Sequence, residues 1–130
     1  MNGNGQLVHC SLRAWNEGGL RALSDGWWAD DIAWHDLPEL PDPQVTRGRG
    51  AAEARVEEMV ATLGHWRFRV KDIEEHGLDL TLAELELVGQ GALSGAAFAG
   101  TVHQICRWRD GRTTEVMTFS ERDSALAALS

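Results

Sequence analysis

The second half of the chain alternates apolar and polar side chains with a period of two, and this pattern most restricts the folds open to it. Trp66, Phe68 and Val70 alternate with basic residues, as in a strand that buries one face. Two turn signals, His76-Gly77 and Asp110-Gly111, divide this half into long strands joined as hairpins. The sequence therefore predicts an antiparallel sheet of long strands.

The first hairpin is predicted to have one buried and one solvated face. If His76-Gly77 forms a two-residue turn, Phe68 lies opposite Leu85, and Arg69 lies opposite Glu84. Such an ion pair belongs on a solvated face, where it stabilises the sheet only modestly.

The second hairpin is predicted to be apolar on both faces near its middle. Pairing across Asp110-Gly111 places His103 opposite Thr118 and Ile105 opposite Val116. The other apolar positions of these strands are Val102, Met117 and Phe119. A strand pair that is apolar on both sides is central in a sheet or covered by a partner, so a homodimer is expected.

The first half and the C-terminus supply helices around this sheet. The elements expected there are a helix over 7–15, a helical stripe over 20–27 after a turn at 16–19, a strand over 32–36, a proline-containing loop over 37–43, a helix over 52–63 that ends at Gly64, and a last helix with Ser120 as N-cap. With 130 residues and no visible linker, the chain is expected to be a single α+β domain over residues 1–130.

Composition excludes several classes of partner. Twelve Lys and Arg against twenty Asp and Glu give a net charge of −8, which repels nucleic acid and anionic membrane surfaces. The chain has no apolar run long enough to span a bilayer and no signal-peptide pattern, so a cytoplasmic location is expected. Cys10 and Cys106 are expected to be unpaired, and the five histidines lack the close spacing of a metal site.

Three segments carry a resemblance to a known superfamily. They are 28–38, with the sequence Trp-Ala-Asp-Asp-Ile-Ala-Trp-His-Asp-Leu-Pro, then Arg47-Gly48-Arg49, and the hairpin 107–112. Together they resemble the nuclear transport factor two-like superfamily, which includes SnoaL-like proteins, ketosteroid isomerases and limonene epoxide hydrolases. The resemblance implies a cone-shaped, curved mixed or antiparallel sheet that wraps around the N-terminal helices and encloses one pocket. It also implies a homodimer that binds a small apolar or polycyclic molecule without a cofactor.

The resemblance also suggests site residues. Asp36 falls where the isomerases keep a proton-moving carboxylate, and desolvation among apolar neighbours is expected to raise its pKa. His103 falls near their protonated aspartate and could donate to a developing oxyanion. The alternatives are that Asp36 accepts a backbone hydrogen bond in a turn and that His103 is a core residue satisfied by Thr118. The expected substrate-binding residues are Trp15, Trp34, Ile105, Val116 and Thr118.

Three functions remain open at this point. The leading hypothesis is a cofactor-independent isomerase or cyclase in which Asp36 moves a proton and His103 assists. The second is a non-catalytic module that binds a ligand or assembles as a dimer, because the fold does not by itself imply catalysis. The third is water activation as in epoxide hydrolases, although Glu84, Glu86 and Thr118 stand where those enzymes keep an Arg, Asp, Asp trio, and the chain has no tyrosine.

Overall fold

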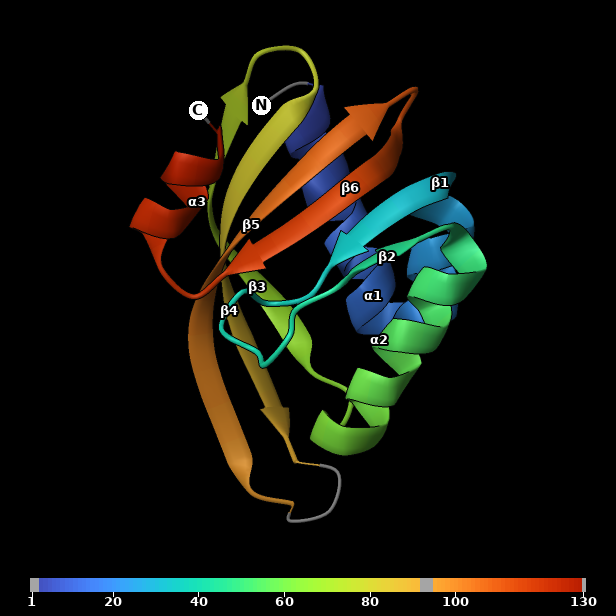
Figure 1. Ribbon diagram of the computed structural model, residues 1–130, viewed down its shortest axis with the longest axis vertical. Helices are drawn as coiled ribbons and strands as arrows, with labels where there is room; N and C mark the ends of the chain where they lie inside the picture. The colour runs from blue at the N-terminus through green and yellow to red at the C-terminus, as the bar shows by residue number, and fades with distance from the viewer. Residues whose placement is uncertain (1–2, 92–94, 130) are drawn as a thin grey trace.

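A computed structural model describes residues 3–91 and 95–129 and has three helices and one six-stranded sheet (Figure 1). The helices are α1 (Asn4–Trp27), α2 (Arg49–Leu63) and α3 (Arg122–Leu129), and the strands are β1 (Trp28–His35), β2 (Val45–Arg47), β3 (Arg67–His76), β4 (Leu80–Gln90), β5 (Ala97–Arg109) and β6 (Arg112–Phe119). The α+β class predicted from the sequence is confirmed.

The sheet is mixed, with strand order β2-β1-β6-β5-β4-β3. All neighbouring strands are antiparallel except β1 and β6, which run parallel. The short strand β2, which follows the proline loop, was not predicted. No helix among the described residues is both long and apolar enough to cross a bilayer.

Helix α1 is broken where the sequence predicts a turn. Gly19 has φ 76° and ψ −165° inside the helix, a left-handed backbone conformation that glycine adopts without a steric penalty. The two predicted helical stripes are therefore the two arms of one kinked helix.

Hydrogen bonds to the backbone fix α1 to the start of the edge strand β3. The indole Nε1 of Trp15 donates to the carbonyl of Trp66 at 2.6 Å. The side chain of Asn16 donates to the carbonyl of Phe68 at 2.7 Å and accepts from its N–H at 2.8 Å. Asn16 thereby satisfies backbone groups that a further strand would otherwise pair with.

Strand β6 contains one extra residue. Trp108 pairs with Thr113, but Arg107 pairs with Glu115, so Thr114 forms a β-bulge. A bulge shifts the register by one residue, and a shift of one exchanges the two faces of a strand relative to its partner.

The bulge overturns the predicted register of the second hairpin. His103 lies opposite Phe119, and Gln104 lies opposite Thr118. The prediction that His103 pairs with Thr118 is therefore wrong, because it assumed regular pairing from the turn onward.

The register of the first hairpin is shifted by two residues. Phe68 pairs with Leu87, and Arg69 pairs with Glu86. The turn spans residues 77–79, which shifts the register by three residues, and an irregularity near Lys71 reduces this shift to two. A shift of two leaves the paired side chains of 67–70 and 85–88 on their predicted faces.

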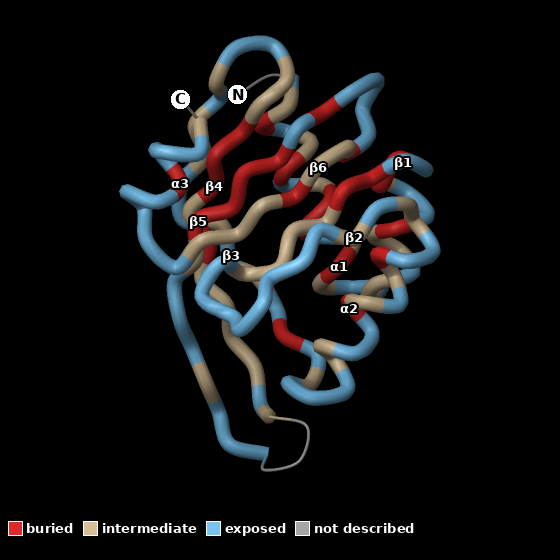
Figure 2. The backbone as a smooth tube through the Cα atoms, viewed as in Figure 1, coloured by how far each residue is buried: buried red, intermediate tan, exposed pale blue. Residues whose placement is uncertain are grey.

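Helices α1 and α2 cover one face of the sheet, which we call the inner face, and α3 lies apart from them (Figure 1). The main cluster of buried side chains lies under α1 and α2, where the middle of the sheet is most deeply buried (Figure 2). It includes Trp15, Trp28, Ile32, Val56 and Leu85.

On the outer face, α3 buries a second, smaller cluster. Ala125 of α3 packs with Leu82 and Ile105, and Met117 and Phe119 pack against this cluster. The apolar side chains that prompted the homodimer prediction thus have a partner within the chain. The homodimer itself stays a prediction.

An ion pair attaches α3 to the sheet and should make stability depend on pH. Nη2 of Arg122 lies 2.7 Å from Oε2 of Glu74, and this contact lowers the pKa of Glu74 below its ordinary 4.5. A carboxyl whose pKa is lowered by folding stabilises the fold above its unfolded pKa, and this contribution is lost as the pH falls through the folded pKa. Glu74→Gln should therefore lower the free energy of unfolding by at most about 1 kcal/mol at pH 7, and this difference should shrink when the pH is lowered toward 3.

Urea unfolding at both pH values measures this difference. Glu121→Gln is the matched control, since Glu121 is exposed and has no ion pair within the described residues. Equal losses in the two variants at pH 7 would contradict the prediction.

Candidate functional site

A small cavity of about 70 Å³ lies on the inner face beside the end of β1. We call it the Asp36 cavity. Its lining is mainly aromatic and aliphatic and consists of Trp34, His35, Asp36, Leu37, Leu40, Met59, Trp66, Phe68, Leu87, Val102, Gln104 and Thr118. Strand alternation explains the contribution of β5, because Val102 and Gln104 are two residues apart and point to the same face.

A second cavity of about 40 Å³ lies deeper, beneath α1. We call it the Trp15 cavity, since Trp15, Trp28, Cys106 and Val116 are in its lining. The two cavities share four lining residues, which are Trp34, Trp66, Phe68 and Gln104. These four side chains form the boundary between them.

The carboxylate of Asp36 is buried and fully oriented by neighbours. Only 6% of its side chain is exposed. Oδ1 accepts from Nε of Arg55 on α2 at 2.9 Å, and Oδ2 accepts from the backbone N–H of Gln44 at 3.1 Å. The same contact with Asp36 raises the pKa of Arg55 above its ordinary value.

This arrangement differs from the carboxylate predicted among apolar groups only. Burial disfavours a charged carboxylate, whereas the adjacent guanidinium and a backbone N–H favour it, so the effects oppose one another. The predicted alternative, a turn residue that accepts a backbone hydrogen bond, is also present, because Oδ2 of Asp36 accepts from the N–H of Gln44. The N–H of Asp36 donates in turn to the carbonyl of Gln44 at 3.0 Å and closes the loop.

The proline loop between β1 and β2 forms one wall of the Asp36 cavity. Leu37 and Leu40 of this loop line the cavity. The hydroxyl of Ser120, at the end of β6, contacts the carboxylate of Glu39, and this hydrogen bond lowers the pKa of Glu39. Ser120 therefore holds the loop against the sheet in addition to preceding α3.

Two of the predicted site residues lie on the wrong face of the sheet. His103 and Ile105 project to the outer face, where Ile105 packs with Ala125 of α3. His103 is 8% exposed and pairs in register with Glu84 and Phe119. Since the Thr114 bulge places Gln104 beside Thr118 instead, His103 and Asp36 do not share a cavity.

The other predicted site residues do border a cavity. Asp36, Trp34 and Thr118 line the Asp36 cavity. Trp15 and Val116 line the Trp15 cavity. The inward orientation of Trp34 and Trp15 follows from strand and helix periodicity, whereas Val116 and Thr118 lie on β6 beyond the Thr114 bulge.

The acidic residues compared with the epoxide hydrolase trio are paired on the outer face. Glu84 lies 3.5 Å from Nζ of Lys71, and Glu86 lies 2.6 Å from Nη2 of Arg69. Nε2 of His35, the residue between Trp34 and Asp36, lies 2.7 Å from Oε2 of Glu115. The carboxylates of Glu84 and Glu86 therefore lie outside the Asp36 cavity. This placement agrees with the predicted solvated face of the first hairpin.

Two residues of the site were missed in the sequence. Arg55 lies on α2 between Ala52 and Met59, next to the apolar stripe. A basic residue beside the buried face of a helix was the signal in the sequence that could have indicated a partner for a buried carboxylate. Gln104 was missed because the expected register gave its place to His103. Its Nε2 donates to Oγ1 of Thr118 at 3.2 Å.

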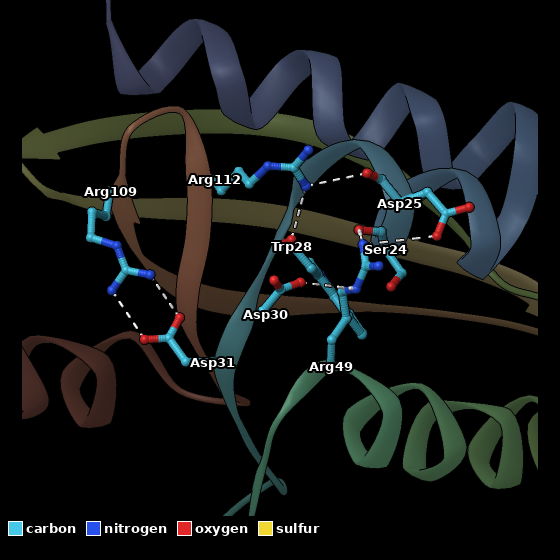
Figure 3. Close-up of polar contacts among 8 residues, drawn as sticks. All are labelled: Ser24, Asp25, Trp28, Asp30, Asp31, Arg49, Arg109 and Arg112. Carbon is cyan, nitrogen blue, oxygen red and sulfur yellow. Dashed lines mark hydrogen bonds and ion pairs between the residues drawn. The ribbon is translucent and has the colours of Figure 1, made fainter.

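A separate polar cleft lies at the other end of β1 (Figure 3). Arg109 and Asp31 form two hydrogen bonds, of 3.1 and 2.7 Å, and this contact lowers the pKa of Asp31. Arg112 donates to the carbonyls of Asp25 and Trp28. Arg109 therefore joins β5 to β1, and Arg112 joins β6 to α1 and β1.

The cysteines and potential metal ligands offer no separate chemistry in the part of the chain described. Cys10 and Cys106 are both free thiols. Burial raises the pKa of Cys106 to about 12, which makes its thiolate inaccessible near neutrality. No group of three or more His, Cys, Asp or Glu side chains within residues 3–91 and 95–129 is arranged to hold a metal ion.

Comparison with known proteins identifies the family. The SnoaL-like domain family matches residues 8–116, which is most of the chain. The protein is a member of the SnoaL-like domain family. No curated protein matches this SnoaL-like domain in sequence.

Solved structures share its fold at low sequence identity. A nuclear transport factor two-like protein of unknown function from Burkholderia pseudomallei has a TM-score of 0.77, 16% identity, and coverage of 98% of this chain and 97% of its own. A protein with a ketosteroid isomerase-like fold from Catenulispora acidiphila, in complex with trimethylamine, has a TM-score of 0.74, 18% identity, and coverage of 93% and 89%. A protein provisionally named as a SnoaL-like polyketide cyclase from Jannaschia sp. has a TM-score of 0.71, 17% identity, and coverage of 95% and 91%. These similarities establish the nuclear transport factor two-like fold.

The Asp36–Arg55 pair should be coupled strongly enough to measure. Arg55→Met leaves a buried carboxylate without its charged partner, which should lower the free energy of unfolding by about 1–3 kcal/mol. Asp36→Asn in the same chain removes that charge, so the double variant should be less destabilised than the sum of the single variants. A double-mutant cycle by urea unfolding at pH 7 measures the coupling.

The pair of Arg55 with Glu58 provides the control. Glu58 is 72% exposed and its Oε2 lies 3.3 Å from Nη1 of Arg55. Its cycle should give a coupling energy close to zero, since solvent screens an exposed pair. Additive effects in the Asp36 cycle would contradict the role assigned to Arg55.

Proposed function

We propose that this SnoaL-like domain binds a small, largely apolar molecule in the Asp36 cavity. The observation that carries the proposal is the lining, in which apolar side chains surround a single oriented carboxylate. The apolar part of the lining consists of Trp34, Leu37, Leu40, Met59, Trp66, Phe68, Leu87 and Val102. Ligand sites are typically apolar with a few fixed polar groups.

The size of the cavity limits the ligand. Sites for drug-sized ligands measure about 300–1,000 Å³, and an apolar cavity of about 150 Å³ is enough for benzene. A cavity of about 70 Å³ therefore needs some outward movement of Leu37 and Leu40 to take even one ring. A single small ring fits with less movement than the polycyclic molecule implied by the resemblance.

A bulky side chain inside the cavity should abolish binding. Val102→Phe adds a phenyl group to the lining, whereas Thr101→Phe adds the same group to the opposite face of the same strand. We expect Val102→Phe to weaken the binding of methylenecyclohexane by about tenfold or more, since the probe and the phenyl group compete for one space.

Ligand-observed NMR with methylenecyclohexane measures this difference. Thr101→Phe should bind the probe as the unmodified protein does, and circular dichroism checks that both variants are folded. Equal binding by both variants would refute the proposed site, as would the absence of binding of both methylenecyclohexane and its ketone counterpart, cyclohexanone, to the unmodified protein.

Proton transfer by Asp36 is a second candidate function. It is favoured by one observation, which is that the buried Asp36 carboxylate borders the apolar cavity and keeps unused acceptor capacity. A carboxylate has about four lone-pair sites, and Arg55 and the N–H of Gln44 occupy one on each oxygen. The reaction is of the isomerase or cyclase type and proceeds without His103.

The proton-transfer step can be written for a ketone. A carboxylate oxygen of Asp36 takes a proton from the carbon next to the carbonyl. The electron pair of the broken C–H bond forms a C=C bond, and the carbonyl π pair moves to the oxygen. Return of the proton to carbon restores the ketone or gives its isomer.

Deuterium exchange at that carbon tests the second candidate. Cyclohexanone in D₂O should exchange its α protons faster with the protein than without it, and Asp36→Asn should remove about 100-fold or more of this acceleration. His103→Gln should leave the exchange rate unchanged. Asp72→Asn, on the sheet away from the cavity, is the matched control.

If the unmodified protein binds the probe but does not accelerate the exchange of its α protons, proton transfer by Asp36 is refuted and the domain is a ligand-binding module. Water activation on an epoxide is not favoured, because Glu84 and Glu86 pair with Lys71 and Arg69 outside the cavity. Self-assembly as a homodimer is a separate prediction, which sedimentation at micromolar concentration measures.

A further inference from the structure

Two indole N–H groups at the Asp36 cavity have no hydrogen-bond acceptor within the described protein. These are Nε1 of Trp34 and Nε1 of Trp66, both of which are buried. Two other tryptophans are satisfied, since Trp15 donates to the carbonyl of Trp66 and Trp108 donates to Oγ1 of Thr81. Buried N–H groups are rarely left unpaired, because each costs the desolvation of a donor.

The position of these two donors indicates where their acceptors belong. Trp34 and Trp66 both line the Asp36 cavity, and both lie on its boundary with the Trp15 cavity. Trp66 is only 5% exposed, so bulk solvent does not reach most of it. A molecule in the cavities is therefore in a position to supply the acceptors.

The remaining polar groups of the cavity define which acceptor fits. The amide Nε2 of Gln104 is already used by Thr118, and the charge of Asp36 is offset by Arg55. The lining thus offers spare neutral donors and no unpaired cation for an anionic ligand. A carbonyl oxygen has two lone pairs, one for each indole N–H, and carries no charge, so it matches these two spare donors better than a carboxylate or a protonated amine.

We propose that the Asp36 cavity selects an uncharged apolar ligand that carries a carbonyl oxygen, and that Trp34 and Trp66 recognise this oxygen through their indole N–H groups. The inference rests on the proposed function, since it concerns the ligand of the same cavity. It adds the chemical class of the ligand and two specificity-determining residues. An indole N–H also stabilises an oxygen that gains negative charge, as the Asp36 reaction requires.

A pair of matched probes tests the role of the oxygen. Cyclohexanone and methylenecyclohexane have the same ring, but the second carries a CH₂ group in place of the carbonyl oxygen. The measured quantity is the ratio of their dissociation constants. We expect Trp34→Phe and Trp66→Phe each to weaken the binding of the ketone relative to the hydrocarbon by about two- to tenfold, because each removes one donor.

Trp108→Phe is the matched control. It also removes a buried indole, but Trp108 lines neither cavity and its N–H already has an acceptor in Oγ1 of Thr81. It should therefore change the affinities for both probes by similar factors and leave their ratio unchanged. Indole ¹H–¹⁵N resonances, assigned with the same variants, should shift for Trp34 and Trp66 with the ketone and much less with the hydrocarbon.

The outcomes separate this inference from the proposed function. If neither probe binds, the ligand cavity itself is refuted, and the inference falls with it. If both bind but the ratio does not respond to Trp34→Phe or Trp66→Phe, the cavity stands and its recognition of a carbonyl oxygen is overturned. Indole shifts of equal size with both probes would likewise overturn it, because they would report occupancy of the cavity without a hydrogen bond.

Discussion

The β-bulge at Thr114 decides which side chains of the sheet face the cavities. Side chains alternate between the two faces of a strand. One extra residue in β6 therefore shifts its pairing with β5 by one, and each inner side chain of β6 lies beside a different residue of β5. Gln104 thereby joins Thr118 at the cavity, and His103 joins the outer face. The Ile105 side chain goes with it and becomes part of the surface that holds α3. A regular hairpin would produce a different site from almost the same residues.

The rest of the cavity depends on polar groups that fix its walls. Asn16 and the indole of Trp15 attach α1 to the edge of the sheet through backbone hydrogen bonds, which are directional in a way that apolar packing is not. Arg55 does the same for α2 through Asp36 at the end of β1. A cavity needs such fixed walls, since unconstrained apolar side chains would collapse into it. The Asp36–Arg55 pair is thus part of the architecture as well as a candidate part of the chemistry.

The sequence allowed prediction of the features that depend on local pattern. Strand alternation, the Gly19 break and the Gly64 helix end are each set by neighbouring residues, and the structure has them. The first hairpin kept its predicted faces because its register error was two residues. The second did not, because its error was one. Arg55 and Gln104 could not be found this way, since their roles arise from contacts between α2 and β1 and between β5 and β6, which no local period encodes.

The placement of the polar groups bears on whether this domain binds or catalyses. A proton-transfer site needs a base and, where charge develops on oxygen, a donor near that oxygen. The sequence suggested Asp36 and His103 for these roles, and only Asp36 borders the cavity. The unpaired indoles of Trp34 and Trp66 supply donors from residues that look purely apolar in a sequence. A base and donors around one apolar cavity satisfy the minimum for enolisation, but the same donors would equally hold a carbonyl ligand that never reacts. Binding of a carbonyl compound is therefore the step common to both functions, and the orientation of its α carbon toward Asp36 is what would separate them.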